Sequence, residues 1–345
     1  MNRWYEQMGP ESDVIISSRV RLARNIAGYA FPSVATIQNK EEILALCKEK
    51  VEKCAKAYQL HWTDLRALTG LERYCYVEQH LLSPELATGD IPGGLILNES
   101  GTMSIMVNEE DHLRIQVILP GLQLQQAYAM CDAFETTFGS HVPYAYDERL
   151  GYLTVCPTNV GTGLRVSAMM HLPALTSTGA MRKILEACGK MGVAVRGVYG
   201  ENSEAEGDLY QISNQVTLGH TETEILENMM HIIRQIQEKE CNMRQKLLQQ
   251  DRTAVEDQVF RAYGILTNAR SISCAEAMRL LSWLRLGCSL ALLPQVNPVV
   301  AKRLLVALQP GMVQQQAGKE LHAHDRDRKR ADICRAMLTQ NEERL

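Results

Sequence analysis

Hydrophobic and polar positions change their spacing at about residue 220, which divides the chain into two parts. In the first part, short runs that alternate or stay apolar between turn residues predict β-strands. The predicted strands are 13–18, 94–98, 102–107, 113–119 and 193–200. Apolar residues at helical spacing predict helices over 38–57, 121–138 and about 178–190. Because the strands follow one another at hairpin-like spacing, without regular strand–helix–strand units, we expect a mostly antiparallel sheet flanked by helices.

The second part is helical throughout. Thr221 and Glu224 have the spacing of a capping box, and roughly 25 residues after them have the periodicity of one long helix. Further predicted helices cover 251–267, 273–286, 297–307 and 325–340. We therefore predict an α+β fold in two domains, with the sheet in 1–220 and an all-α domain in 221–345.

The composition indicates the broad class of protein to which the chain belongs. The chain has 345 residues, 46% of them hydrophobic and 22% charged, which is ordinary for a globular protein with two domains. A net charge of −4 argues against bulk affinity for nucleic acid or an acidic membrane. Ten cysteines occur without any C-x-x-C pair, so neither a zinc site nor a dithiol motif is indicated. No signal core or run near the roughly 18 apolar residues of a membrane span is present, and we expect a cytoplasmic protein with reduced thiols.

Residues 152–172 combine several groups that could bind a ligand. We expect a strand through Cys156 that breaks at Pro157, and a second strand after Arg165. Between them, Gly161 and Gly163 would let a ligand approach the main chain closely. A thiol before the loop and a guanidinium after it suggest an anion site with a reactive edge. The alternative is a glycine-containing hairpin with a buried cysteine.

Five arginines occur at predicted strand ends or in loops: Arg19, Arg21, Arg114, Arg165 and Arg196. If 19–21 is a strand, its first and last side chains point to the same face. Guanidinium groups suit phosphate oxygens, and several could together hold a nucleoside triphosphate. Neither a P-loop nor the protein-kinase signature set is present, so arginines would have to replace the lysine and glycine loop used elsewhere. The alternative is that each is a solvated surface residue.

Two acidic clusters lie close to these arginines in the chain. Residues 108–112 (NEEDH) carry three consecutive carboxylates before Arg114, and 201–207 (ENSEAEG) carry three more after Arg196. Such clusters are most often solvated loops, but their neighbours make them candidates for a site.

Four stretches, taken together, resemble a known family. SSRVRLARN, NEEDHLR, CPTNVGTGLR and RGVYGENSEAEGDLYQISN resemble, in this order, the signature stretches of the phosphagen (guanidino) kinases. The resemblance covers about residues 10–220 and implies the guanidino-kinase catalytic fold. Two features depart from creatine and arginine kinases: their large helical N-terminal domain is missing, and Tyr199 stands where they usually carry an arginine. With a helical domain after 220, these departures resemble the bacterial protein-arginine kinases, which phosphorylate arginine side chains in proteins.

The resemblance implies roles for individual residues. Glu110 would be the general base, Glu201 would hold the same guanidinium, and Cys156 as a thiolate would add negative charge. The five arginines would bind the phosphates of ATP, and Mg²⁺ would bridge phosphate oxygens with few direct protein ligands. The implied nucleotide-binding residues are Ser17, Ser18, Arg19, Val20, Arg21, His80, Arg114, Arg165, Val166, Ser167, Ala168, Met169, Arg196, Gly197, Val198, Tyr199, Gly200 and Glu201.

The C-terminal part carries a second motif of the same family. Arg326, Asp327, Arg328, Lys329, Arg330 and Ala331 match the R-D-x-x-R-A motif that binds phosphoarginine at an allosteric site. Without the resemblance this run would be interpreted as a solvated helix face. In a helix, Arg326 and Arg330 would share a face and could hold one phosphoryl group.

Partners also follow from the resemblance alone. They would be proteins with exposed arginines, a zinc-binding activator protein, a heat-shock repressor and a Clp-type ATPase and protease, and the kinase would be a homodimer. Two other functions compete with the protein-arginine kinase: a kinase for a free small guanidine, and a non-enzymatic adaptor that reads phosphoarginine. The product formed from ATP and an arginine-rich protein would separate the three.

Overall fold

The computed structural model describes residues 3–198 and 205–339, and its centre is an antiparallel sheet. Eight strands pair in the order β2-β3-β4-β5-β1-β8-β10-β9, and every pairing is antiparallel. The strands are β1 (Ile15–Arg24), β2 (Leu60–Asp64), β3 (Gly94–Asn98), β4 (Met103–Val107), β5 (Leu113–Pro120), β8 (Leu164–His171), β9 (Val193–Gly197) and β10 (Leu209–Asn214). A separate hairpin consists of β6 (Tyr146–Asp147) and β7 (Gly151–Tyr152).

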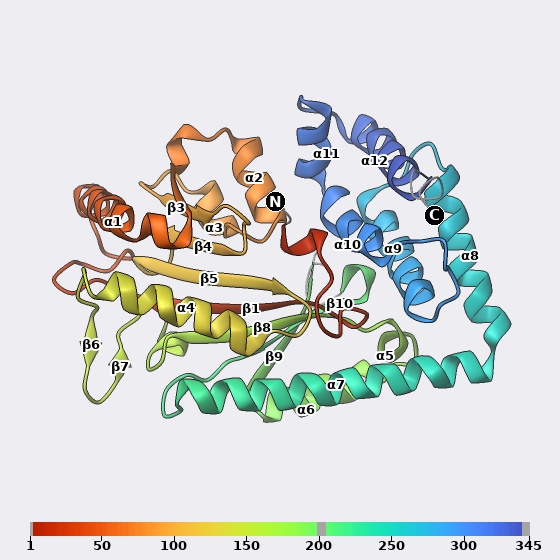
Figure 1. Cartoon of the computed structure of the whole chain (residues 1–345), viewed down its shortest axis with the longest axis horizontal. Coiled ribbons are helices and arrows are strands. Elements are labelled where there is room, and N and C mark those ends of the chain that lie inside the picture. The colour runs from red at the N-terminus through yellow and green to blue at the C-terminus, as the bar shows by residue number, and fades with distance from the viewer. Residues whose placement is uncertain (1–2, 199–204, 340–345) are drawn as a thin grey trace.

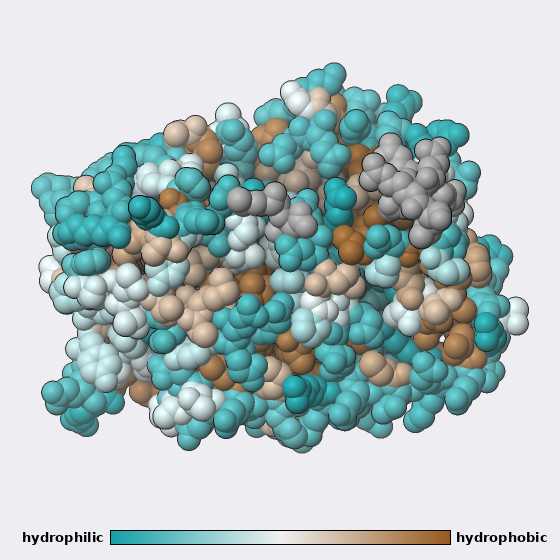
Figure 2. Space-filling model, in the orientation of Figure 1, coloured by the Kyte–Doolittle hydropathy of each residue, from teal (hydrophilic) through white to brown (hydrophobic). Residues whose placement is uncertain are grey.

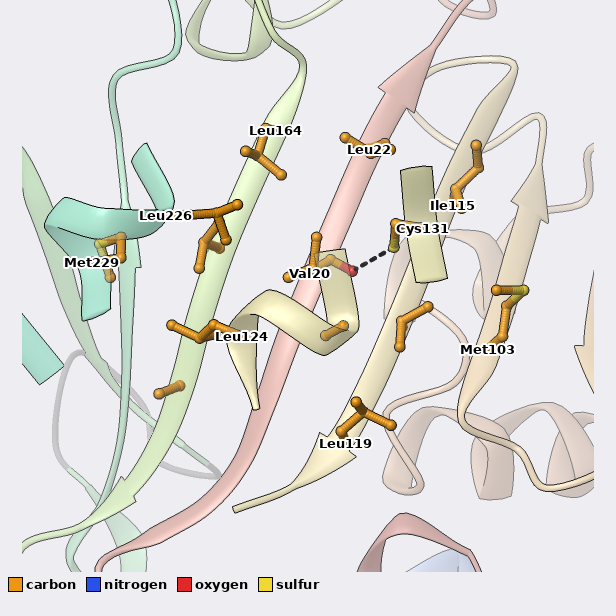
Figure 3. Close-up of a cluster of buried hydrophobic side chains, with 14 of the residues drawn as sticks. Val20, Leu22, Met103, Ile115, Leu119, Leu124, Cys131, Leu164, Leu226 and Met229 are labelled. Carbon is orange, nitrogen blue, oxygen red and sulfur yellow. Dashed lines mark hydrogen bonds between the residues drawn. The ribbon is translucent and has the colours of Figure 1, made fainter. Parts of the chain in front are cut away.

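Helices from distant parts of the chain cover one face of this sheet (Figure 1). They are α1 (Ile37–Tyr58), α4 (Leu124–Gly139), α5 (Pro173–Ser177), α6 (Met181–Lys190) and α7 (Glu222–Gln250). In Figure 3, Leu124 and Cys131 of α4 and Leu226 and Met229 of α7 lie over Val20, Leu22 and Leu164 of the central strands. The Cys131 thiol also donates to the Val20 carbonyl at 3.6 Å. Burial of this continuous apolar layer, at about 25 cal/mol per Å², holds α4 and α7 to the sheet.

A second hydrophobic cluster joins the other face of the sheet to the remaining helices. It includes Ile16 of β1, Met106 of β4 and Met169 of β8, together with the C-terminal helices. These helices are α8 (Arg252–Asn268), α9 (Cys274–Ser289), α10 (Pro298–Ala307), α11 (Pro310–Ala317) and α12 (Ala323–Thr339). Two short helices of the first part, α2 (Gly70–Glu78) and α3 (Pro84–Thr88), border the same face. Single 3-10 turns occur at Trp4–Glu6, Leu65–Ala67, Pro157–Asn159 and Glu206–Asp208.

The antiparallel sheet, the flanking helices and the helical second part are confirmed. The capping box at α7 is also confirmed, since Thr221 Oγ1 accepts from the Glu224 amide and the Glu224 carboxylate accepts from the Thr221 amide. Helix α7 packs on the sheet through its N-terminal half, while α8 to α12 form the region right of centre in Figure 1. None of the helices in the described residues is long and apolar enough to cross a membrane. The face seen in Figure 2 is mostly hydrophilic, with apolar patches scattered between charged side chains.

Two details of the predicted secondary structure are wrong. The strand expected over 152–156 ends at Tyr152, because the Val155 amide and the Cys156 carbonyl bond side chains (Asp111 and Thr154) and not a neighbouring strand. Arg19 and Arg21 lie in the middle of β1 and not at its end. Several short elements are not predicted by the sequence pattern, among them β2, α2, α3 and α11, because they carry few apolar residues at regular spacing.

Candidate active site

One pocket of about 970 Å³ collects most of the predicted catalytic side chains. Strands β1, β5, β8, β9 and β10 contribute residues to it, together with α2, α3 and the loop from Cys156 to Gly163. The predicted residues that line it are Arg19, Arg21, His80, Glu110, Arg114, Cys156, Arg165, Arg196 and Val198. Residues separated by up to 179 positions in the sequence therefore meet in one cavity.

Strand register brings the arginines together. Arg19 and Arg21 alternate with the buried Val20, so their side chains share the pocket face of β1, as predicted. Arg21 lies directly opposite Arg165 of β8, and Arg114 is the second residue of β5 on the other side of β1. Like charges in directly opposed positions repel, so the arrangement favours a polyanion in the pocket.

The electrostatics of the pocket support this. Burial and the neighbouring Arg114 and Arg165 lower the pKa of Arg19 to about 10. Burial lowers the pKa of Arg21 well below its usual value, and the charges of Arg19 and of the same two neighbours act in the same direction. The pKa of Arg165 is lowered by burial and by Arg196. Of the five pocket arginines, only Arg114 has carboxylates of the described residues within 4 Å, with Glu109 at 2.8 Å and Glu110 at 3.7 Å. Three phosphates would supply the negative charge that the other four guanidinium groups lack.

A carboxylate and a thiol lie in the same pocket as the arginines. The Cys156 thiol and the Glu110 carboxylate line the same pocket, and the Thr158 hydroxyl lies 3.0 Å from the Cys156 sulfur. Burial and the adjacent Asp111 raise the pKa of Glu110, whereas Arg114 lowers it. A carboxylate with a raised pKa accepts a proton more readily than an ordinary glutamate, which suits a general base.

The glycines of the Cys156 loop serve packing. A Cβ on Gly163 would lie 2.6 Å from the Ala23 carbonyl oxygen, and one on Gly161 would lie 2.7 Å from the Thr217 carbonyl oxygen. Both residues also have positive φ, 61° and 110°. The close approach that the sequence predicted is therefore between this loop and the protein's own main chain.

His80 lies on another side of the pocket, near the sheet. Its carbonyl accepts from Gln116 Nε2 at 2.7 Å, and its ring lies 5.8 Å from that of Trp4. Burial and the charge of Arg19 lower its pKa to about 3, so the imidazole is neutral near pH 7. A neutral ring beside the arginines adds no further positive charge.

The remaining predicted nucleotide-binding residues contribute differently. Val20, Val166 and Ala168 are fully buried in the core on the opposite face, so only their main chain could approach a ligand. The other buried members of the predicted set are Ser17, Ser18, Ser167 and Met169. Gly197 ends β9, next to Arg196. Tyr199, Gly200 and Glu201 lie outside the described residues.

The sequence analysis missed a contribution from the helical part. Gln309, just before α11, lines the pocket beside Tyr74 and Glu78 of α2. Both oxygens of the Glu78 carboxylate accept main-chain hydrogen bonds at the first turn of α11, from Gly311 at 2.7 Å and Met312 at 2.8 Å. No sequence signal links residues this far apart, and only the packing of α2 on α11 reveals the contact.

The R-D-x-x-R-A run lies on α12, as expected for a helix. Arg330 is 1% exposed and donates to the Leu308 and Ile272 carbonyl oxygens at 2.8 and 2.9 Å. It also pairs with Asp327 at 2.6 Å. Arg326 is partly exposed and Arg328 is exposed, whereas Ala331 is buried and Lys329 is partly buried. The Arg330 guanidinium, predicted to bind a phosphoryl group together with Arg326, is therefore hydrogen-bonded within the protein in this structure.

Comparisons with known proteins agree with this arrangement. Residues 42–243 match the family described as ATP:guanido phosphotransferase, C-terminal catalytic domain. Residues 252–345 match the family described as protein-arginine kinase McsB C-terminal domain. Among solved structures, the duplicated taurocyamine kinase from Schistosoma mansoni is 26% identical with a TM-score of 0.59, covering 68% of this chain and 35% of that one. Lombricine kinase has a TM-score of 0.57 at 23% identity over 68% of this chain and 69% of that one, which shows the shared fold.

Curated relatives extend over both parts. The protein-arginine kinase of Brevibacillus brevis is 45% identical over 339 residues, which is 98% of this chain and 95% of the relative. That of Halalkalibacterium halodurans is 43% identical over 343 residues, 99% of this chain and 96% of the relative. This favours the first of the three functions that the sequence left open. Because the similarity spans the sheet and the helical part alike, the chain belongs to the protein-arginine kinases, enzymes built on the ATP:guanido phosphotransferase fold.

Proposed function

We propose that this pocket transfers the γ-phosphoryl group of ATP to an arginine side chain of a protein, with Glu110 as the general base. The observation that carries the proposal is that Glu110 and Cys156 line one pocket with five arginines, with the Glu110 carboxylate 3.7 Å from the Arg114 guanidinium. A guanidinium is a poor nucleophile because it stays protonated and its lone pairs are delocalised. A carboxylate in hydrogen-bond reach orients it and accepts its proton as nitrogen attacks phosphorus.

The arginines stabilise the negative charge of the phosphoryl group while it is transferred. Arg19, Arg21 and Arg165 would bind the phosphates, and Arg114 and Arg196 would complete the ring around them. Because the strands fix these side chains before the nucleotide arrives, little reorganisation accompanies the reaction. Cys156 as a thiolate would add negative charge next to the substrate guanidinium, and Glu201 would hold it from the other side.

In this scheme Mg²⁺ would bind together with ATP. In residues 3–198 and 205–339, no three His, Cys, Asp or Glu side chains gather where they could hold a metal ion. The ion would therefore be bound mainly by phosphate oxygens, where it neutralises part of their charge.

Replacing Glu110 by glutamine tests the proposal. We expect kcat to fall by at least about 100-fold with nearly unchanged ATP affinity, because glutamine keeps the shape but cannot accept the proton. The assay follows transfer of labelled phosphate from ATP to an arginine-rich protein, and Glu99→Gln on the exposed β3–β4 turn is the control. Near-normal turnover of Glu110→Gln would assign the base to another residue.

For the helical part we propose phosphoarginine binding at α12, with control of the kinase through α11. The support is that Arg330 holds Leu308 and Glu78 holds Gly311 and Met312, so one turn contacts both α12 and the pocket wall. Arg326 and Arg328 are the guanidinium groups of the motif that reach the surface. We keep the division into 1–220 and 221–345 as part of this proposal.

The biological setting is likewise proposed from the family. It comprises a homodimer, a zinc-binding activator, a heat-shock repressor as substrate and delivery of marked proteins to a Clp-type protease. A cytoplasmic location suits the ten cysteines, all of which lie in the described residues as free thiols.

A further inference from the structure

Asp111, the residue after the proposed base, is turned away from the pocket. It is 2% exposed, whereas the side chain of Glu110 is 38% exposed. Its Oδ1 atom accepts two hydrogen bonds, from the Val155 amide at 2.8 Å and from Asn25 Nδ2 at 2.7 Å. Val155 immediately precedes Cys156, so one carboxylate oxygen connects the segment that carries the base to the segment that carries the thiol.

Asn25, the residue after β1, bonds the same two segments as Asp111, and we call the pair the Asp111–Asn25 joint. It is 1% exposed, and its Nδ2 also donates to the Leu153 carbonyl at 3.1 Å while its Oδ1 accepts from the His112 amide at 2.9 Å. Every polar atom of the Asn25 side chain therefore holds either the acidic loop or the chain that leads to Cys156. Residues 153–155 do not belong to a strand of the sheet. The hydrogen bonds of the Asn25 and Asp111 side chains therefore hold this segment where strand pairing would otherwise do so.

The chemistry of the joint is costly if it serves packing alone. Burial raises the pKa of Asp111, and Glu109 acts in the same direction, while the Val155 and Asn25 hydrogen bonds oppose it. An apolar residue at this position would leave the Val155 amide and Asn25 Nδ2 without their acceptor, which costs stability. What an apolar residue could not do is fix two main-chain segments at hydrogen-bond distance from one atom.

We propose that Asp111, together with Asn25, is the positioning residue that sets Glu110 and Cys156 at their working separation. It touches neither ATP nor the substrate guanidinium and acts through Glu110. The inference rests on the proposed role of Glu110. A displacement of the reacting groups by about 1 Å is enough to lower the rate by up to about 100-fold.

Two substitutions at position 111 separate hydrogen bonding from charge. Asp111→Ala removes the acceptor, and we expect kcat to fall by about 10- to 100-fold with the KM for ATP within about threefold of the parent. Asp111→Asn keeps an oxygen that can accept from both donors, and we expect it to retain activity within about fivefold. Asp64→Ala is the matched control, because one Asp64 oxygen also accepts two hydrogen bonds, from Arg66, on the exposed edge of the sheet.

A double-mutant cycle with Glu110→Gln tests whether Asp111 acts through the base. If it does, Asp111→Ala costs less than about threefold in the Glu110→Gln background, because the group that it positions is already inactive. A loss of the same factor in both backgrounds would show a general structural effect and overturn the proposal, as would near-normal kcat of Asp111→Ala.

The rate at which iodoacetamide alkylates Cys156 gives a readout that does not require turnover. We expect Asp111→Ala to change this rate at least threefold and Asp111→Asn to leave it near the parent value. An unchanged rate in Asp111→Ala overturns the positioning role even where activity is lost. Full activity of Glu110→Gln alone would instead contradict the proposed function, so the two failures are distinguishable.

Discussion

Replacing Arg330 by methionine should destabilise the helical part of the kinase, whatever it does to ligand binding. Methionine fills a similar length but donates no hydrogen bond, so the Leu308 and Ile272 carbonyl oxygens lose their donor in the interior. Leaving a buried acceptor unsatisfied costs about 1–3 kcal/mol, which gives about 2–6 kcal/mol for the two. The ion pair with Asp327 adds less than about 1 kcal/mol, because that carboxylate is about one-third exposed.

Dehydration of the guanidinium, which methionine avoids, offsets part of this cost. We therefore expect a net loss of about 3 kcal/mol, which corresponds to a Tm lower by roughly 5–10 °C. Arg326→Met is the control, because Arg326 is partly exposed and donates a hydrogen bond to the Leu321 carbonyl at 3.0 Å. Its loss should cost under about 1 kcal/mol.

Thermal unfolding of both variants, followed by calorimetry with phosphoarginine well below the lower Tm, separates structure from binding. The expected pattern is a destabilised Arg330→Met and an Arg326→Met of normal stability with weakened phosphoarginine binding. A normal Tm for Arg330→Met together with lost binding would refute the reasoning, because it would mean that the guanidinium is available to the ligand and not needed by the fold.

Three further predictions concern single groups. Cys156→Ala should lower kcat less than Glu110→Gln does, and ATP should slow inactivation of the parent by thiol alkylation; inactivation at equal speed in Cys156→Ala would place the sensitive thiol elsewhere. Burial raises the pKa of Glu78 to about 7, so its contribution to stability is greatest below about pH 4.5 and falls as the pH rises to 7. The free energy of unfolding of Glu78→Gln, measured in urea, should therefore rise relative to that of the parent by up to about 3 kcal/mol between about pH 4.5 and 7. A difference that stays constant with pH would contradict this. Burial and Arg285 lower the pKa of Lys302 to about 7, so the folded state favours the neutral amine and the free energy of unfolding should rise between about pH 7 and 10. Lys302→Met should lack this rise. The same pH profile of unfolding in parent and variant would show that another group titrates.

The centre of the pocket could be predicted partly from a local rule and partly from the family resemblance. Alternation along a strand placed Arg19 and Arg21 on one face. That the other three pocket arginines join them was implied by the family resemblance, and the register that sets Arg165 opposite Arg21 is seen only in the structure. The position of Arg19 and Arg21 in mid-strand was not foreseen, because polar residues in a run of alternating sequence look like a strand end. Glu201 stays a prediction, since it lies outside the described residues.

What could not be predicted depends on which face of an element is buried and on what packs there. Helical spacing correctly set Arg326 and Arg330 on one side of α12, but it could not show that Arg330 points into the protein. Likewise Glu78 looks like any charged residue in a short helix, and its partners at 311 and 312 lie more than 230 positions away. Burial of a charged group is decided by the hydrogen bonds available at its destination, and these are absent from the local sequence.

The turn from Leu308 to Met312 connects these two unforeseen residues. Arg330 donates to its first residue, Glu78 accepts from its last two, and Gln309 between them lines the pocket. A hydrogen bond that involves a charged group is about twice as strong as one between neutral groups. The bond from Arg330 is of this kind, and the bonds to Glu78 become so as its carboxyl ionises around pH 7, so the turn is held from α12 and from α2 at once. A ligand that binds α12 can change the kinase only if it favours one position of this turn over another. The buried contacts of Arg330 and Glu78 are where that preference would be expressed, and by linkage a nucleotide that shifts α2 would change the affinity at α12 by the same factor.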